Sequence, residues 1–114
     1  MSGQSSDSQL RRSSCPLACT LDILGDRWTL LVIRDLYFGR SRFKDFIASP
    51  EKIPTNILSE RLSRLLQNEI IEKIPVENST KRLAYQLTEK GRELLPILRE
   101  MHDWGLKWEG EVNP

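Results

Sequence analysis

The sequence predicts one mainly α-helical domain with a single small β-hairpin. At 114 residues and 13.2 kDa, the chain has the length of one domain that can bury a substantial core. Apolar residues recur at helical spacing through most of it. The exception is residues 70–87, where two β-type stretches flank a polar turn. The domain is expected to span residues 15–110, after a polar arm at residues 1–14 whose composition predicts disorder.

The first two helices are predicted from their end signals. Pro16 suits the first position of a helix, and Gly25 suits its end. Asp26 can cap a second helix that continues to Gly39. Because residues 29–36 are apolar on nearly every side, we expect this second helix to be the buried centre of the domain.

A short helix and a longer polar-faced helix are expected next. After a link at residues 40–42, Phe43, Phe46 and Ile47 indicate a short amphipathic helix. A turn at residues 49–52 leads to a helix over residues 55–68. The inward face of this longer helix is predicted to consist of Leu58, Leu62, Leu65 and Leu66.

The C-terminal third predicts the hairpin and a last helix. Residues 70–76 and 83–87 form the two strands, and residues 77–82 form a polar turn between them. Thr88 can cap the last helix, whose apolar spacing continues to Trp108. Pro96 lies inside that pattern and is expected to bend the helix.

Three helices followed by a two-stranded hairpin form the layout of a winged helix-turn-helix. In that layout the second helix of the pair enters a DNA major groove, and the hairpin tip can reach a neighbouring minor groove or the backbone. Cationic side chains bind phosphates, and short hydrogen-bonding side chains can bond to base edges. The expected DNA-contacting residues are Arg42, Lys44, Thr55, Asn56, Ser59, Glu60, Arg61, Arg64, Lys81 and Arg82.

Some of these residues have more than one interpretation. Arg61 can reach a phosphate or pair with an acidic neighbour, and Arg64 is expected to project outward. Glu60 can accept from cytosine or repel incorrect sites. A winged-helix protein-interaction module without DNA binding is the alternative for the whole domain, because a polar helix face is also compatible with solvent alone.

Composition excludes several other classes of protein. The net charge is +1, but residues 34–87 hold ten basic and seven acidic residues, which favours a polyanionic partner. One His and two Cys leave a metal site short of ligands, and no catalytic or phosphate-loop motif is present, so we expect neither an enzyme nor a cofactor. With no signal-peptide or membrane-spanning pattern, a cytoplasmic protein is predicted.

Several segments together resemble the HxlR-type transcriptional regulators. They are Cys15-Pro16-Leu17, residues 21–31, Leu36-Tyr37-Phe38-Gly39 with Arg42-Phe43, Ile53-Pro54 with residues 58–62, residues 85–91, and Leu94-Leu95-Pro96. The resemblance covers about residues 15–108 in order. It implies a bacterial, cytoplasmic, dimeric winged-helix regulator that binds operator DNA.

The first and last helices are expected to form the dimer. The resemblance implies this arrangement, and the last helix carries more apolar bulk than one small core needs. The expected interface residues are Leu17, Leu21, Leu98, Met101, Trp104 and Trp108. Two recognition helices would then lie about one turn of DNA apart.

Cys15 is a candidate redox sensor. It precedes Pro16 at a predicted helix start, where the helix dipole favours a thiolate that oxidants can attack. The resemblance also implies that some family members sense oxidants or electrophiles through a cysteine at the matching position. Alternatively, Cys15 is a helix-entry residue without a chemical role. An oxidant or a small-molecule effector is therefore an expected partner.

Overall fold

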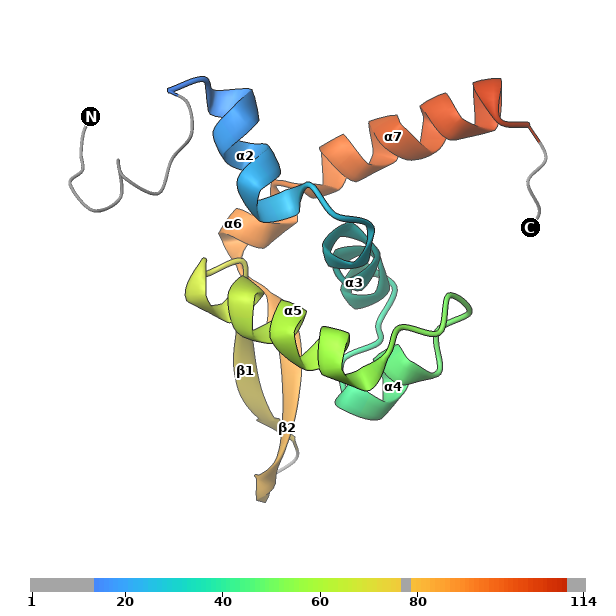
Figure 1. Ribbon diagram of the computed structural model, residues 1–114. Coiled ribbons are helices and arrows are strands. Elements are labelled where there is room, and N and C mark those ends of the chain that lie inside the picture. Colours follow the sequence, from blue (N-terminus) through green and yellow to red (C-terminus); the bar gives the residue numbers. More distant parts are fainter. Residues whose placement is uncertain (1–13, 77–78, 111–114) are drawn as a thin grey trace.

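The structure is a computed structural model that describes residues 14–76 and 79–110. The predicted arm lies outside these residues, apart from Ser14. In chain order the elements are α2 (Pro16–Leu24), α3 (Arg27–Tyr37), α4 (Phe43–Ile47), α5 (Thr55–Gln67), β1 (Ile71–Val76), β2 (Ser79–Leu87), α6 (Glu89–Arg92) and α7 (Leu95–Trp108). Helices and a two-stranded hairpin follow the predicted order, so the expected fold class is confirmed (Figure 1).

Helix α3 is the centre of the domain, as its apolar spacing predicted. The Asp26 carboxylate caps it by accepting hydrogen bonds from the amides of Trp28 and Thr29. The helix ends at Tyr37, and Gly39 then adopts a positive φ of 101°. The core combines the buried Val32 and Ile33 of α3 with buried side chains of the surrounding elements, namely Phe46, Leu58, Leu62, Leu65, Ile71 and Leu87.

The hairpin is longer on its second strand than the sequence predicted. The strands are antiparallel, with Ile71 opposite Leu87 and Pro75 opposite Leu83. Strand β2 already begins at Ser79, so the prediction of a turn through residue 82 is wrong: an irregular register beyond Pro75 takes up the extra residues. The link before α4 also joins the hairpin, because the Tyr85 amide donates to the Ser41 carbonyl at 2.8 Å.

Pro96 divides the predicted last helix into two. The expectation of one bent helix is wrong: α6 ends at Arg92, and α7 starts at Leu95 with Pro96 in its first turn. Proline lacks the amide that an internal helical bond needs, but the first turn needs no such bond. Thr88 caps α6 as predicted, since its hydroxyl accepts from the Gly91 amide.

Helices α2 and α7 extend from the side of the domain opposite the hairpin (Figure 1). In the described chain, no helix has both the length and the apolar character needed to cross a membrane. Both extending helices instead expose large apolar side chains, namely Leu17, Leu21, Ile97, Met101, Trp104, Leu106 and Trp108. Leu98 is half-buried and packs against the core, as does Trp28.

Candidate nucleic-acid interface

Helix α5 lies beside the hairpin (Figure 1) and presents a polar face to solvent. Its exposed residues include Thr55, Asn56, Ser59 and Glu60, all four of which the sequence predicted as DNA contacts. Ser63 and Gln67 continue this exposed face toward the C-terminal end of the helix. The face therefore carries hydroxyl, amide and carboxylate groups that can bond to base edges.

The opposite face of α5 fixes the direction of these polar side chains. Leu58 and Leu65 are fully buried and Leu62 is nearly so, which confirms these three residues of the predicted inward face, while Leu66 is half-buried against the core. Because residues three and four apart share one side of a helix, burying these leucines turns Ser59 and Asn56 outward. Rotation of α5 about its axis would expose core leucines, so the polar face is held in one orientation.

Two arginines of α5 bind Asp26 at the start of α3. Arg61 Nε donates to Asp26 Oδ2 at 2.8 Å, and Arg64 Nη2 donates to Asp26 Oδ1 at 3.0 Å. The expected outward projection of Arg64 is therefore wrong, since its guanidinium turns back toward α3 and also contacts Thr29. Of the two interpretations of Arg61, the structure shows the acidic partner, because Arg61 pairs with Asp26 and also with Glu60.

The Asp26 carboxylate is kept ionised by this arrangement. Partial burial would raise its pKa, but hydrogen bonds from Thr29 and Arg61 outweigh that effect and lower the pKa to about 2. One carboxylate thus caps α3 and joins α3 to two successive turns of α5. Asp26 consequently stabilises both the helix start and the position of the recognition helix.

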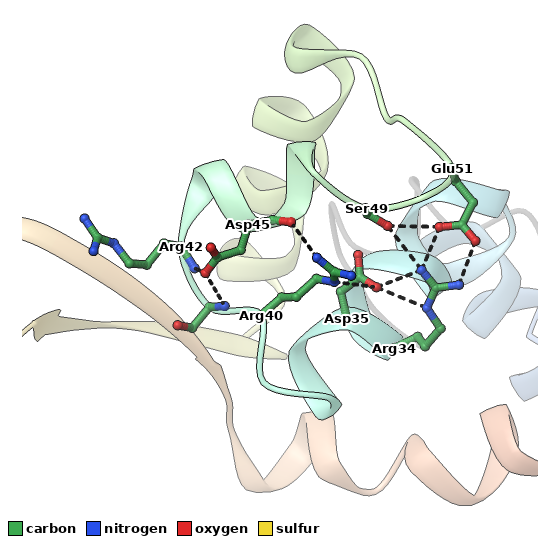
Figure 2. A network of polar contacts seen from close by, with 8 residues as sticks. Arg34, Asp35, Arg40, Arg42, Asp45, Ser49 and Glu51 are labelled. Carbon is green, nitrogen blue, oxygen red and sulfur yellow. Dashed lines mark hydrogen bonds and ion pairs between the residues drawn. The ribbon is translucent and has the colours of Figure 1, made fainter.

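A second polar network holds the turn between α4 and α5. The Arg34 guanidinium makes two bonds to the Glu51 carboxylate, at 2.9 Å and 2.7 Å, and a third to Ser49 (Figure 2). Arg34 also binds the neighbouring Asp35, which is buried. The bidentate bond from Arg34 lowers the pKa of Glu51 to about 2. This network fixes the turn that leads into α5.

Arg42 and Lys44 lie at the start of α4, as predicted. The Asp45 carboxylate accepts from the backbone amides of Arg42 and Ser41, which closes the first turn of α4. The bond from the Arg42 amide is the main cause of a lowered Asp45 pKa. The Arg42 guanidinium extends away from this network (Figure 2), and Lys44 is exposed. Both cations thus lie at the start of α4, the helix that precedes α5.

The hairpin tip is only partly described. Lys81 and Arg82 belong to strand β2 rather than to the predicted turn, and their side chains are not among those that the structure describes. The tip residues 77–78 also lie outside the described part. DNA contacts by Lys81 and Arg82 therefore stay predictions.

Sequence reasoning missed the long-range partners of this site. It identified Asp26 as a cap but not as the partner of Arg61 and Arg64, and it gave Arg34 no role. The signal available was weak: an acidic cap and two arginines one helical turn apart, separated from that cap by more than thirty residues. Only the packing of α5 across α3 brings these groups together.

The remaining predicted sites differ in their surroundings. Cys15 is exposed at the position before α2, and Cys19 is half-buried one turn later. Within residues 14–76 and 79–110, no cluster of three or more His, Cys, Asp or Glu side chains could hold a metal ion.

The helix pair, its polar face and the hairpin define a winged helix-turn-helix protein. Residues 23–113 match the HxlR-like helix-turn-helix family, so the chain belongs to that family of DNA-binding transcriptional regulators. Among its relatives, YodB of Bacillus subtilis, an HTH-type transcriptional regulator, is 37% identical over 79% of this chain and 81% of its own. YdeP of the same organism is 32% identical over 87% and 77% of the two chains.

Solved structures have the same fold. Reduced YodB from B. subtilis superposes with a TM-score of 0.70 and 34% identity, over 90% of this chain and all of the YodB chain. The redox regulator HypR in its reduced form superposes with a TM-score of 0.73 and 29% identity, over 82% and 92% of the two chains. YodB has also been solved bound to quinone, and HypR in an oxidised form.

Proposed function

We propose that the chain regulates transcription as a homodimer that recognises operator DNA through the exposed face of α5. One observation carries this proposal: Thr55, Asn56, Ser59 and Glu60 are exposed on a helix whose opposite side is buried in the core. Burial of the opposite side fixes the direction in which this face points, as contact with base edges requires. As a regulator of transcription, the protein would act in the cytoplasm and have no catalytic role.

The proposed contacts divide by chemistry. Asn56 and Ser59 offer donors and acceptors to base edges, and Glu60 offers an acceptor for cytosine. Arg42 and Lys44 would contact phosphates beside the groove, with Lys81 and Arg82 doing so from the hairpin. Arg61 and Arg64 serve binding in a different way, because their bonds to Asp26 hold α5 in position.

Selection of duplexes from a random library, followed by titration of the variants, tests this proposal. We expect Asn56→Ala to weaken binding to the selected duplex by about 1–3 kcal/mol and to change binding to random duplex little. Gln86→Ala, an exposed amide on the hairpin strand β2, is the matched control. Equal losses on both duplexes would contradict base recognition by Asn56. Absence of any DNA binding at low salt would favour the protein-interaction alternative.

The homodimer is supported by the apolar surface of the two extending helices. Leu17, Leu21, Met101, Trp104 and Trp108 are exposed in the single chain, and Leu98 lies beside them half-buried. Large exposed apolar patches mark interaction sites. A two-fold pairing through α2 and α7 would cover these side chains and leave α5 outside the interface, because α2 and α7 extend from the side opposite the hairpin (Figure 1).

Control by thiol chemistry is supported by the position of Cys15 and by the relatives. Cys15 is exposed at the N-terminus of α2, within the proposed dimer region, and YodB and HypR are solved in more than one redox or ligand state. We expect diamide to reduce DNA binding by the wild type and to leave Cys15→Ser unaffected. Equal responses of the two proteins would make Cys15 a structural residue only.

A further inference from the structure

The turn before α5 contains a lysine in a backbone conformation that favours glycine. Lys52 has a φ of 58°, in the left-handed region, and its amide donates to the Ser49 carbonyl at 3.0 Å. Pro50 occupies the second position of this turn, and glycine is the residue favoured at its fourth position, where Lys52 lies. A side chain at this position therefore destabilises the turn relative to glycine.

The conformation of Lys52 is imposed from both sides. Before it, Ser49 is buried and its amide bonds to the Phe46 carbonyl, while Arg34 holds Glu51 with two bonds. After it, Ile53 is buried in the core. Lys52 joins these two fixed points in a left-handed conformation, so relaxing its backbone would break interactions on one side or the other.

The charge at this turn is positive and directed to solvent. The Glu51 carboxylate is occupied by Arg34 and Ser49 (Figure 2), so it does not neutralise its neighbour. Lys52 is exposed, and its ammonium has no hydrogen-bond or ion-pair partner among the residues that the structure describes. It stands just before Thr55, the first residue of the recognition helix.

We propose that Lys52 binds a phosphate of the DNA backbone as α5 enters the major groove, and that this contact explains a lysine where the fold favours glycine. The proposal rests on the proposed DNA contact of α5. A cation at the entrance of the recognition helix would set the depth and register of that helix without reading sequence. The Arg34–Glu51 network would hold in place the turn that carries this ammonium.

A second residue provides an internal control. Among the described residues, Glu69 is the other non-glycine residue with a positive φ, at 60°. It follows Asn68 at the C-terminal end of α5, a place where left-handed residues commonly end helices. Glu69 thus shares the backbone conformation of Lys52 but lies at the far end of α5 and carries a negative charge.

The experiment measures the thermal stability and DNA binding of Lys52→Gly, Lys52→Gln, Lys52→Arg and Glu69→Gly. The probe is a labelled random-sequence duplex of about 30 base pairs, titrated between 50 and 200 mM salt. We expect Lys52→Gly to melt at or above the wild-type temperature while its Kd rises about 3- to 10-fold. Its slope of log K against log salt should fall by about 0.9 for each phosphate that the protein no longer neutralises.

The other variants separate charge from backbone geometry. Lys52→Gln should weaken binding as Lys52→Gly does, Lys52→Arg should bind like the wild type, and Glu69→Gly should not weaken binding. Wild-type affinity and salt slope in Lys52→Gln would overturn the phosphate contact, even if Lys52→Gly binds weakly. A wild-type protein that binds no duplex at low salt would overturn both this contact and the proposed function. If the wild type binds DNA and the Lys52 variants bind equally well, only the Lys52 contact is overturned, and DNA recognition by α5 is unaffected.

Discussion

The helix-turn-helix buries or pairs its side chains within one chain, whereas the terminal helices leave large apolar side chains exposed. In the first region, α3, α4 and α5 bury their apolar faces together, and Asp26 and Glu51 pair with arginines of neighbouring elements. In the second region, α2 and α7 contribute few side chains to that core and leave Trp104 and Trp108 more than half exposed. Within one chain, the helix-turn-helix thus covers its apolar side chains, whereas the two terminal helices leave theirs exposed.

The orientation of the recognition helix α5 therefore has a different structural cause from the spacing between two such helices. The orientation of α5 depends on interactions inside one chain, so it should survive changes in the terminal helices. In the proposed homodimer, the distance between the two recognition helices would depend on how the two chains meet. Such a dimer would change its binding to operator DNA when α2 and α7 move, while the helix-turn-helix stays intact.

The largest expected effect comes from removing Asp26. Asp26→Ala removes the cap of α3 and leaves Arg61 and Arg64 without their shared carboxylate. Losing a cap costs about 1 kcal/mol, and partly buried charges without partners add to this, so we expect the free energy of unfolding to fall by about 2–4 kcal/mol. Urea unfolding measures the change.

Asp103→Ala is the matched control for that measurement. Asp103 is an exposed aspartate on α7 that contacts only the neighbouring His102 among the described side chains. Its removal should change stability by less than about 0.5 kcal/mol. A loss of the same small size in Asp26→Ala would mean that the ion pairs with α5 contribute little to the fold.

An acid titration should reveal the Arg34–Glu51 bond next. The pKa of Glu51 is about 2 in the folded chain, below its value when unfolded, so the unfolded state binds more protons at low pH. This contribution is complete above about pH 5 and is lost as pH falls toward 2, amounting to about 2 kcal/mol. Glu51→Gln should lose about that much less stability than the wild type between pH 5 and 2.5. Parallel pH curves would contradict the prediction.

The exposed tryptophans should matter to assembly and not to the single chain. Trp104 makes no contribution to the buried core, so Trp104→Ala should change the stability of the isolated chain by less than about 0.5 kcal/mol. In a dimer formed by α7, truncating a large aromatic side chain should raise the dissociation constant at least about tenfold. Sedimentation across a concentration series measures this constant. Unchanged association would place Trp104 outside the interface.

The sequence predicted those features that local spacing controls. The buried face of α5 follows from leucines at positions 58, 62 and 65, and the start of α3 follows from Asp26 beside an apolar run. Both are consequences of helical periodicity and capping within a few residues. The resemblance then related these elements to a known arrangement.

Features set by distant parts of the chain were missed or wrong. Arg64 was expected to project outward because its position on the helix wheel is polar, yet Asp26 draws its side chain toward α3. Pro96 was expected to bend one continuous last helix. Instead, the buried Gly91 in α6 packs against the carbonyl of Ile70, and the chain starts a new helix, α7, after α6 ends. In both cases the outcome depends on contact with a distant element, whose position the spacing of apolar residues does not predict.

The smallest expected effects come from two glycines, one in the packed domain and one on the exposed helix α7. A Cβ at Gly91 would lie 2.2 Å from the Ile70 carbonyl oxygen, whereas a Cβ at Gly105 would meet nothing within 4 Å in the single chain. Gly91→Ala should therefore destabilise the fold. Gly105→Ala should stabilise α7 by about 0.5–1 kcal/mol, because alanine loses less backbone entropy in a helix.

In the proposed dimer, Gly105→Ala should weaken association even though it stabilises α7 in the single chain. Gly105 follows Met101 by four residues and precedes Trp108 by three, so it lies on the α7 face proposed for assembly. A methyl group there would hold a partner helix farther away and should raise the dimer dissociation constant about threefold, while the melting temperature of the dilute single chain increases. Calorimetry at low concentration and sedimentation at high concentration separate the two effects. A dimer that tightens along with the helix would show that no partner packs closely over Gly105.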